Sequence, residues 1–169
     1  MKRYTLTTLA IVLVLSTILI GTQFSLATAK EPKILEFDTM VGLPQAFTGT
    51  QNPIRGINGG GLPWAIDSGS GELKANGKLE ISVQGLVLAA GSNAGSNPIA
   101  NFRAIVSCLT SDAGVANVST DLFPATTGPA SSGGGNAQIE TTLDLPQPCI
   151  APIIFVTSPG GAWFAATGH

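Results

Sequence analysis

Regular alternation between apolar and polar residues is the feature that most restricts how this chain can fold. The clearest example is residues 137–145, where Ile139, Leu143 and Leu145 are apolar and polar residues lie between them. Side chains of a strand point alternately to its two faces, so this segment buries one face and exposes the other. Such a pattern is typical of an antiparallel sheet with one face in water. Helical periodicity is nearly absent from residues 30–169.

A second alternating segment, residues 102–109, predicts a strand whose apolar face carries one of the two cysteines. The residues expected to point inward are Phe102, Ala104, Val106 and Cys108. Cys108 and Cys149 are the only cysteines, and in an exported protein an even count predicts a disulfide. The bridge would close a loop of 41 residues, which stabilises the fold by roughly 4 kcal/mol in the chain-entropy model.

A β-hairpin is predicted around Gly77. A two-residue turn would place Leu73 opposite Glu80 and mix apolar with charged residues on each face. A three-residue loop instead places Leu73 opposite Leu79 and Glu72 opposite Glu80, which keeps the two faces distinct. We therefore expect the three-residue loop, with Gly77 in the left-handed conformation that such loops need.

The remaining strands are expected where short β-prone runs lie between turn signals. They cover residues 34–37, 64–67, 84–89, 115–122, 150–157 and 163–167. Many short strands with turn signals every few residues are typical of β-sandwiches. The sequence thus predicts an all-β chain whose residues 30–169 form a single antiparallel β-sandwich domain of Ig-like or jelly-roll type. The glycine-rich connection 128–136 is expected to be its most flexible loop.

The first 29 residues have the three parts of a secretion signal. Lys2 and Arg3 follow the first methionine, a largely apolar stretch comes next, and Ala27 and Ala29 form a cleavage site of small residues. This order predicts a signal peptide at residues 1–29 and a secreted or cell-surface location for the rest. The alternative is an uncleaved N-terminal helix that anchors the chain, because the apolar stretch approaches the ~18 residues that span a bilayer.

Charge argues against two classes of partner. Residues 30–169 hold six basic and ten acidic residues, a net charge of −4, and contain no basic run. Nucleic acids and anionic membranes are bound through clustered lysine and arginine. We therefore expect no nucleic-acid partner, and no membrane contact beyond the N-terminal segment.

Few residues offer catalytic or metal chemistry. The only histidine is the last residue, His169, and no G-x-S-x-G motif is present, so a Ser-His-Asp hydrolase is not expected. One histidine and one cysteine pair do not supply the ligands of a zinc, copper or iron site. No phosphate-binding motif is present either. The sequence predicts no catalytic residue, no metal and no cofactor.

Paired carboxylates are the one catalytic arrangement that remains, because glycoside hydrolysis needs only two of them at a set separation. The candidates are Asp67, Glu72, Glu80, Glu140 and Asp144. Alternation places the last four on outward strand faces, where isolated acids mostly keep a surface soluble. Asp67 is the least poorly placed of the five.

Each of the two tryptophans follows a glycine-rich bend. Together they would form an aromatic platform for a sugar or a peptide, which makes Trp64 and Trp163 the candidate ligand-binding residues. The alternative is that both anchor the core of the sandwich, the commoner place for such large side chains.

These observations predict a secreted, non-enzymatic β-sandwich protein that binds a ligand or takes part in surface interaction or assembly. The expected partners are a glycan or another protein outside the cell, or further copies of the chain, with edge strands and neutral polar faces as the contact surfaces. The alternative function is a small carbohydrate-active enzyme that uses paired carboxylates.

Overall fold

The computed structural model describes residues 30–167, and its regular elements are β-strands apart from two short 3₁₀ turns. All pairs of named strands are antiparallel. The prediction of an all-β, antiparallel chain is therefore confirmed. The predicted signal peptide, residues 1–29, and the terminal His169 lie outside the described residues.

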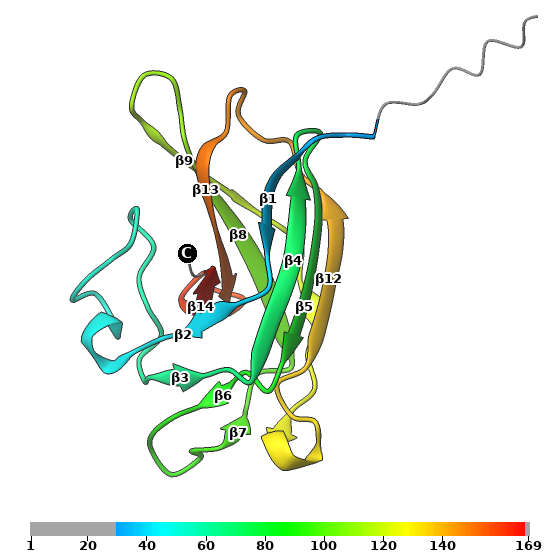
Figure 1. The fold of residues 1–169 in the computed structure, drawn as a ribbon. Helices are drawn as coiled ribbons and strands as arrows, with labels where there is room; N and C mark the ends of the chain where they lie inside the picture. Colours follow the sequence, from blue (N-terminus) through cyan, green and yellow to red (C-terminus); the bar gives the residue numbers. More distant parts are fainter. Residues whose placement is uncertain (1–29, 168–169) are drawn as a thin grey trace, which may run out of the picture.

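The first sheet has four strands in the order β1-β4-β5-β12. Figure 1 shows β4, β5 and β12 as long arrows side by side, with neighbouring arrows pointing in opposite directions and β1 beside β4. Their bounds are β1 Lys33–Phe37, β4 Ser68–Lys74, β5 Lys78–Gln84 and β12 Ala137–Thr142. The strands β4 and β5 are consecutive in the sequence and pair with each other, whereas β12, which pairs with β5, lies far along the chain.

The second sheet has six strands in the order β10-β8-β13-β14-β2, and β9 pairs with the remaining length of β8. Its bounds are β2 Met40–Gly42, β8 Asn101–Leu109, β9 Val115–Ser119, β10 Phe123–Pro124, β13 Ile150–Thr157 and β14 Trp163–Thr167. The long strands β8 and β13 lie at its centre and carry most of its apolar residues.

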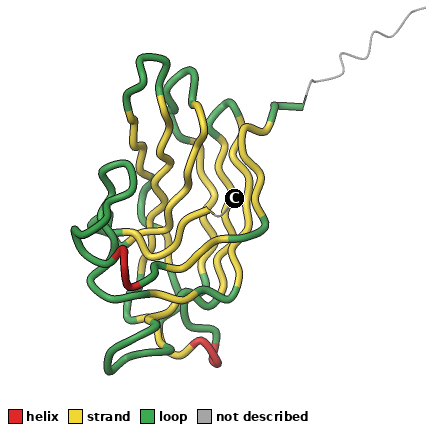
Figure 2. Tube along the Cα trace, turned by 60° about the vertical axis from the view of Figure 1, so that its left-hand side comes forward, coloured by secondary structure: helices red, strands yellow, loops and turns green. Residues whose placement is uncertain are grey.

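Two small two-stranded sheets and two 3₁₀ turns complete the described part of the chain. In Figure 2 the 3₁₀ turns lie in loops outside the main strands. The small sheets pair β3 with β6 and β7 with β11. The bounds are β3 Trp64–Ala65, β6 Val87–Leu88, β7 Ser96–Asn97, β11 Gly128–Pro129, η1 Gln45–Phe47 and η2 Ala130–Ser132.

The β4–β5 hairpin has the register that its sequence predicts. Leu73 lies opposite Leu79, and Glu72 lies opposite Glu80. Gly77 has a φ of 85°, in the left-handed region, and its N–H donates to the carbonyl of Lys74 at 2.9 Å. The three-residue loop is confirmed, and with it the separation of an apolar from a charged face.

One cluster of buried residues contains side chains from both main sheets. Leu79, Ile81 and Val83 of β5 belong to the same cluster as Val106 of β8 and Ile154 of β13. The four residues of β8 predicted to point inward are all fully buried, so that prediction is confirmed. The two sheets thus share their apolar core.

The disulfide between Cys108 and Cys149 is present, as predicted. Cys108 is fully buried in the core, and Cys149 is half-buried where the chain enters β13. The bridge ties the end of β8 to the start of β13, its neighbour in the sheet.

Several strands differ in length from the predicted ones. The strand predicted at residues 137–145 ends at Thr142, and those predicted at 64–67 and 84–89 shrink to β3 and β6. In contrast, the strands predicted at 150–157 and 163–167 have those bounds in β13 and β14.

Candidate functional site

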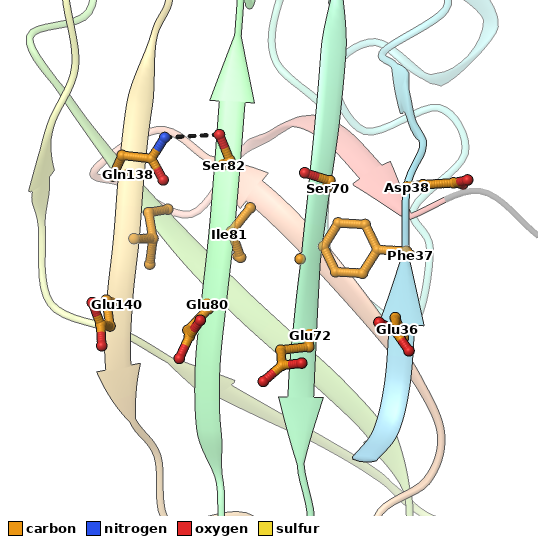
Figure 3. Close-up of a pocket in the computed structure, with 12 residues that line it drawn as sticks. Glu36, Phe37, Asp38, Ser70, Glu72, Glu80, Ile81, Ser82, Gln138 and Glu140 are labelled. Atoms are coloured by element: carbon orange, nitrogen blue, oxygen red, sulfur yellow. Dashed lines mark hydrogen bonds between the residues drawn. The ribbon is translucent and has the colours of Figure 1, made fainter.

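The outer face of the four-stranded sheet is the candidate site. Alternation in each strand sends one set of side chains into the core and the other set outward. The outward side chains are almost all polar, and a shallow depression of about 830 Å³ lies over them. We call this surface the polar face; its outward residues are Glu36, Asp38, Ser70, Glu72, Glu80, Ser82, Gln138 and Glu140 (Figure 3).

Four glutamates form a row across all four strands of the polar face. Glu36 lies opposite Glu72, Glu72 opposite Glu80, and Glu80 opposite Glu140. Directly opposed residues of an antiparallel pair have Cβ atoms about 4.5–5.5 Å apart, so like charges in this arrangement repel one another. Figure 3 shows the four carboxylates side by side at one level of the sheet.

Three lysines offset this repulsion. The Nζ of Lys33 lies 2.6 Å from a carboxylate oxygen of Glu36 and 2.8 Å from one of Glu72. Lys74 lies 2.9 Å from the second oxygen of Glu72.

At the other end of the row, the Nζ of Lys78 lies 2.5 Å from Glu80 and 3.7 Å from Glu140. The row therefore contains four carboxylates and three ammonium groups, with donors and acceptors close together.

These contacts set the ionisation of the central carboxylate. Hydrogen bonds from Lys33, and then from Lys74, lower the pKa of Glu72 from its ordinary 4.5 to about 2. The pKa values of Lys33 and Lys78 are raised, chiefly by hydrogen bonds to Glu36 and to Glu80 respectively. Glu72 is thus a carboxylate that keeps its charge under ordinary conditions and does not act as a proton donor.

A row of neutral polar groups lies beside the glutamates. Ser70 lies opposite Ser82, and Ser82 lies opposite Gln138. The Nε2 of Gln138 donates to the hydroxyl oxygen of Ser82 at 2.7 Å, which fixes both side chains against the sheet (Figure 3).

A second depression, of about 530 Å³, adjoins the first at Gln138. It runs past the N-terminal end of β12, where Gln84 of β5 and Thr126 and Asn136 of the neighbouring loops line it. Val83, Pro124, Ala125 and Ala137 also line it, so this second depression is of mixed polar and apolar character.

Both candidate ligand-binding tryptophans lie in the interior. Trp64 is 5% exposed and stacks on Phe164 with ring centroids 3.9 Å apart. Trp163 is 3% exposed and contacts the rings of Phe47 and Phe155. Neither ring presents a face to solvent, so a sugar could stack on one only if the interior opened. This is the core placement that the sequence left open as the alternative.

The structure brings three of the five candidate carboxylates together and separates the other two. Glu72, Glu80 and Glu140 share the polar face. Asp67 lies in the turn before β4, with its side chain against Gly85, outside both depressions. Asp144 is exposed beyond the end of β12.

Among residues 30–167 no group of three or more histidine, cysteine, aspartate or glutamate side chains is arranged to hold a metal ion. The same residues contain no helix long and apolar enough to cross a membrane. Comparison with protein-family models, with curated proteins and with solved structures found no match to this chain.

The sequence predicts only part of the polar face. Alternation predicts that Glu72, Glu80 and Glu140 point outward, but it does not predict that Glu36 and Gln138 lie beside them. The row exists because β1 pairs with β4 and β12 pairs with β5. Pairing between strands so distant in sequence leaves no signal in the alternation of either strand.

Proposed function

We propose that this protein is a non-enzymatic binding protein that acts outside the cell and holds a hydroxyl-rich glycan on the polar face. The observation that carries the proposal is the pair of in-register rows, one of glutamates with lysines and one of serines with Gln138.

The chemistry of the rows suits sugar hydroxyl groups, which both donate and accept hydrogen bonds. Carboxylates accept, ammonium groups donate, and the amide of Gln138 does both. Lys33 and Lys78 already hold the glutamates in place through the salt bridges, so little side-chain freedom is lost when a ligand binds.

The shape of the site favours an extended ligand. Sites for small molecules are concave and mostly apolar, whereas this depression is open, and eight of its twelve lining residues are charged or polar. A polysaccharide chain lying across the four strands, and continuing past Gln138 into the second depression, would contact both rows.

The carboxylates support binding better than hydrolysis. A retaining or inverting glycosidase needs one carboxyl group with a raised pKa to act as general acid. Glu72 has its pKa lowered to about 2, and Lys78 contacts both Glu80 and Glu140.

An extracellular location is part of the proposal. The Cys108–Cys149 disulfide is compatible with an oxidising environment, and the expected signal peptide precedes the described residues. We further infer that the two main sheets stack as a β-sandwich, since they share one apolar core.

The proposal is tested by co-sedimentation of the oxidised protein with a panel of insoluble polysaccharides and cell-wall preparations. We expect at least one of these materials to retain the protein in the pellet. No retention by any of them would contradict the proposal. Soluble reducing sugar released during the same incubation would instead favour the carbohydrate-active enzyme.

A further inference from the structure

A long segment without strands, residues 44–63, crosses the outer side of the six-stranded sheet; we call it the strap. It connects β2 to β3, and its two ends meet where the N–H of Trp64 donates to the carbonyl of Leu43 at 2.9 Å. Loops of this length are uncommon in compact proteins, where they are usually either functional or disordered. The strap is the cyan segment between β2 and β3 in Figure 1.

The tip of the strap is a tight turn at Arg55 and Gly56. Ile54 and Ile57 exchange backbone hydrogen bonds of 3.1 and 2.9 Å across it. Both central residues have positive φ, 49° and 80°, as in the two-residue turns of β-hairpins. Glycine adopts such values freely, but an arginine rarely does, so something must hold Arg55 in place.

The side chain and carbonyl of Arg55 join the tip to three strands. Its Nη1 donates to the carbonyl of Ser107 in β8 at 2.7 Å, and its Nη2 donates to the carbonyl of Ala151 in β13 at 2.8 Å. The Nδ2 of Asn117 in β9 donates to the carbonyl of Arg55 at 3.1 Å. This single residue therefore fastens the tip to the sheet.

The sheet is adapted to this contact. Ala151 has a φ of 45°, and the register between β13 and β8 shifts between Ile150 and Ile153. Such irregularities redirect a carbonyl that would otherwise face the neighbouring strand. Uncommon backbone conformations thus occur on both sides of the contact, at Arg55 and at Ala151, and each persists only while its surroundings hold it.

The strap covers an apolar surface of β8, β13 and β14. Phe47 of the strap contacts the ring of Trp163, and Asn58 and Gly60 hydrogen-bond to the backbone of Trp163 at 2.9 and 3.0 Å. Ile105 and Phe155, opposite each other in register, are buried on the same face.

Two polar groups on this covered face lack partners. The Nε1 of Trp163 and the Oγ of Ser107 are buried and have no hydrogen-bond partner among residues 30–167. Burying a polar group without a partner carries a free-energy cost, because its hydrogen bonds to water are lost and not replaced. Water reaching these atoms would remove that cost, so uncovering the face is less unfavourable than uncovering a purely apolar one.

We propose that the strap is a lid that Arg55 latches: it opens as a unit and uncovers the β8–β13–β14 face while both sheets stay folded. Opening breaks the hydrogen bonds that join Arg55 to three strands. It also breaks those between the strap and the backbone of Trp163, and it exposes the indole ring of that residue. The closed strap keeps this apolar surface from contact with other molecules.

Native-state hydrogen exchange of the oxidised protein tests the proposal. Two amides join the strap to the sheet: that of Gly60 donates to the carbonyl of Trp163, and that of Trp163 donates to the carbonyl of Asn58. In the parent, these two amides and the indole N–H of Trp163 should exchange faster than the core amides of β5. In Arg55→Ala, the strap and indole groups should exchange faster again, by on the order of tenfold or more, with β5 unchanged. Asn52→Ala, which removes a bond inside the strap to Ala46, should leave the indole rate unchanged.

Three results would overturn the proposal. Equal rates for the strap and β5 in the parent would show that the strap opens only when the whole fold unfolds. If the exchange rates of the strap and indole groups are unchanged in Arg55→Ala, Arg55 does not hold the strap closed. Equal acceleration of strap and β5 in that variant would show that Arg55 stabilises the entire fold rather than the lid.

Discussion

Among single residues, Glu72 is the carboxylate of the polar face that two lysines contact. Lys33 and Lys74 contact its two carboxylate oxygens at 2.8 and 2.9 Å, and glutamates flank it on both neighbouring strands. The same hydrogen bonds that keep Glu72 ionised relieve the repulsion within the glutamate row. The polar face is therefore a surface whose arrangement depends on pH at its central residue.

Glu72 makes the stability of the fold depend on pH in the acid range. Its folded pKa, about 2, lies below the ordinary 4.5, so its ion pairs stabilise the fold fully above about pH 4.5 and are lost as the pH falls toward 2. We expect Glu72→Gln to reduce the fall in melting temperature between pH 4.5 and pH 2.

The control for this measurement is Asp144→Asn, because Asp144 is exposed and lies off the polar face. It should keep the pH dependence of the parent. If the melting temperature of Glu72→Gln falls between pH 4.5 and pH 2 as much as that of the parent, or more, Glu72 is not the source of this pH dependence.

The disulfide is the second residue-scale feature with a measurable effect. It closes a 41-residue separation, and its removal frees the unfolded chain from that constraint. We expect the double variant Cys108→Ala and Cys149→Ala to unfold in urea with a free energy of unfolding lower by roughly 4 kcal/mol. The parent with its disulfide reduced should lose a similar free energy of unfolding. A loss below about 1 kcal/mol relative to the oxidised parent would contradict this expectation.

Among the elements, the β4–β5 hairpin shows how much the sequence specifies locally. Its loop length, its register and the left-handed Gly77 could all be predicted, because the pairing of apolar residues and the position of glycine both favour the three-residue loop. The inward face of β8 and the disulfide were predictable for the same reason: each rests on residues close in sequence or on the only available pair.

Other elements could not be predicted, because their partners lie far away in sequence. The short strand β2 has no alternation of its own and forms by pairing with β14. The glycine-rich residues 128–136, expected to be a flexible loop, contain β11 and η2, and Gly134 and Gly135 are buried. Gly135 packs against the backbone of Leu86 too closely to admit a side chain, so glycine here permits close approach rather than flexibility.

The tight loop of the hairpin gives the element-scale prediction. A Cβ at Gly77 would collide with the carbonyl oxygen of Leu143, and φ there is positive. We expect Gly77→Ala to lower the free energy of unfolding by about 1–3 kcal/mol.

Gly61→Ala is the matched control, since no atom lies near that position and its φ is not positive. It should change the free energy of unfolding by less than about 0.5 kcal/mol. Equal effects of the two substitutions in chemical denaturation would show that the strained turn is not what requires glycine at Gly77.

At the scale of the whole molecule, the two main sheets share a core but differ on their other faces. The four-stranded sheet leaves its outer face open, with ordered polar side chains, whereas the strap covers the six-stranded sheet. The edge strands of the four-stranded sheet, β1 and β12, carry Lys33, Glu36 and Glu140, and the pairing of β1 with β4 is irregular at Lys33. The start of β12 is also covered by a bridge between Ala137 and Ala125. Charges and bulges at sheet edges oppose pairing between copies of the chain. The polar face is therefore a better surface for contact with a ligand than the edges are.

The most direct test of the account compares retention on the binding polysaccharide between the parent and the double variant Glu80→Gln and Gln138→Ala. Both residues line the polar face, so the variant should lose at least about tenfold in affinity at an unchanged melting temperature.

The control pair is Asp121→Asn and Gln51→Ala, both exposed and outside the two depressions; it should bind as the parent does. Undiminished binding by the polar-face variant, or equal loss by the control, would contradict the proposal that this sheet face holds the glycan.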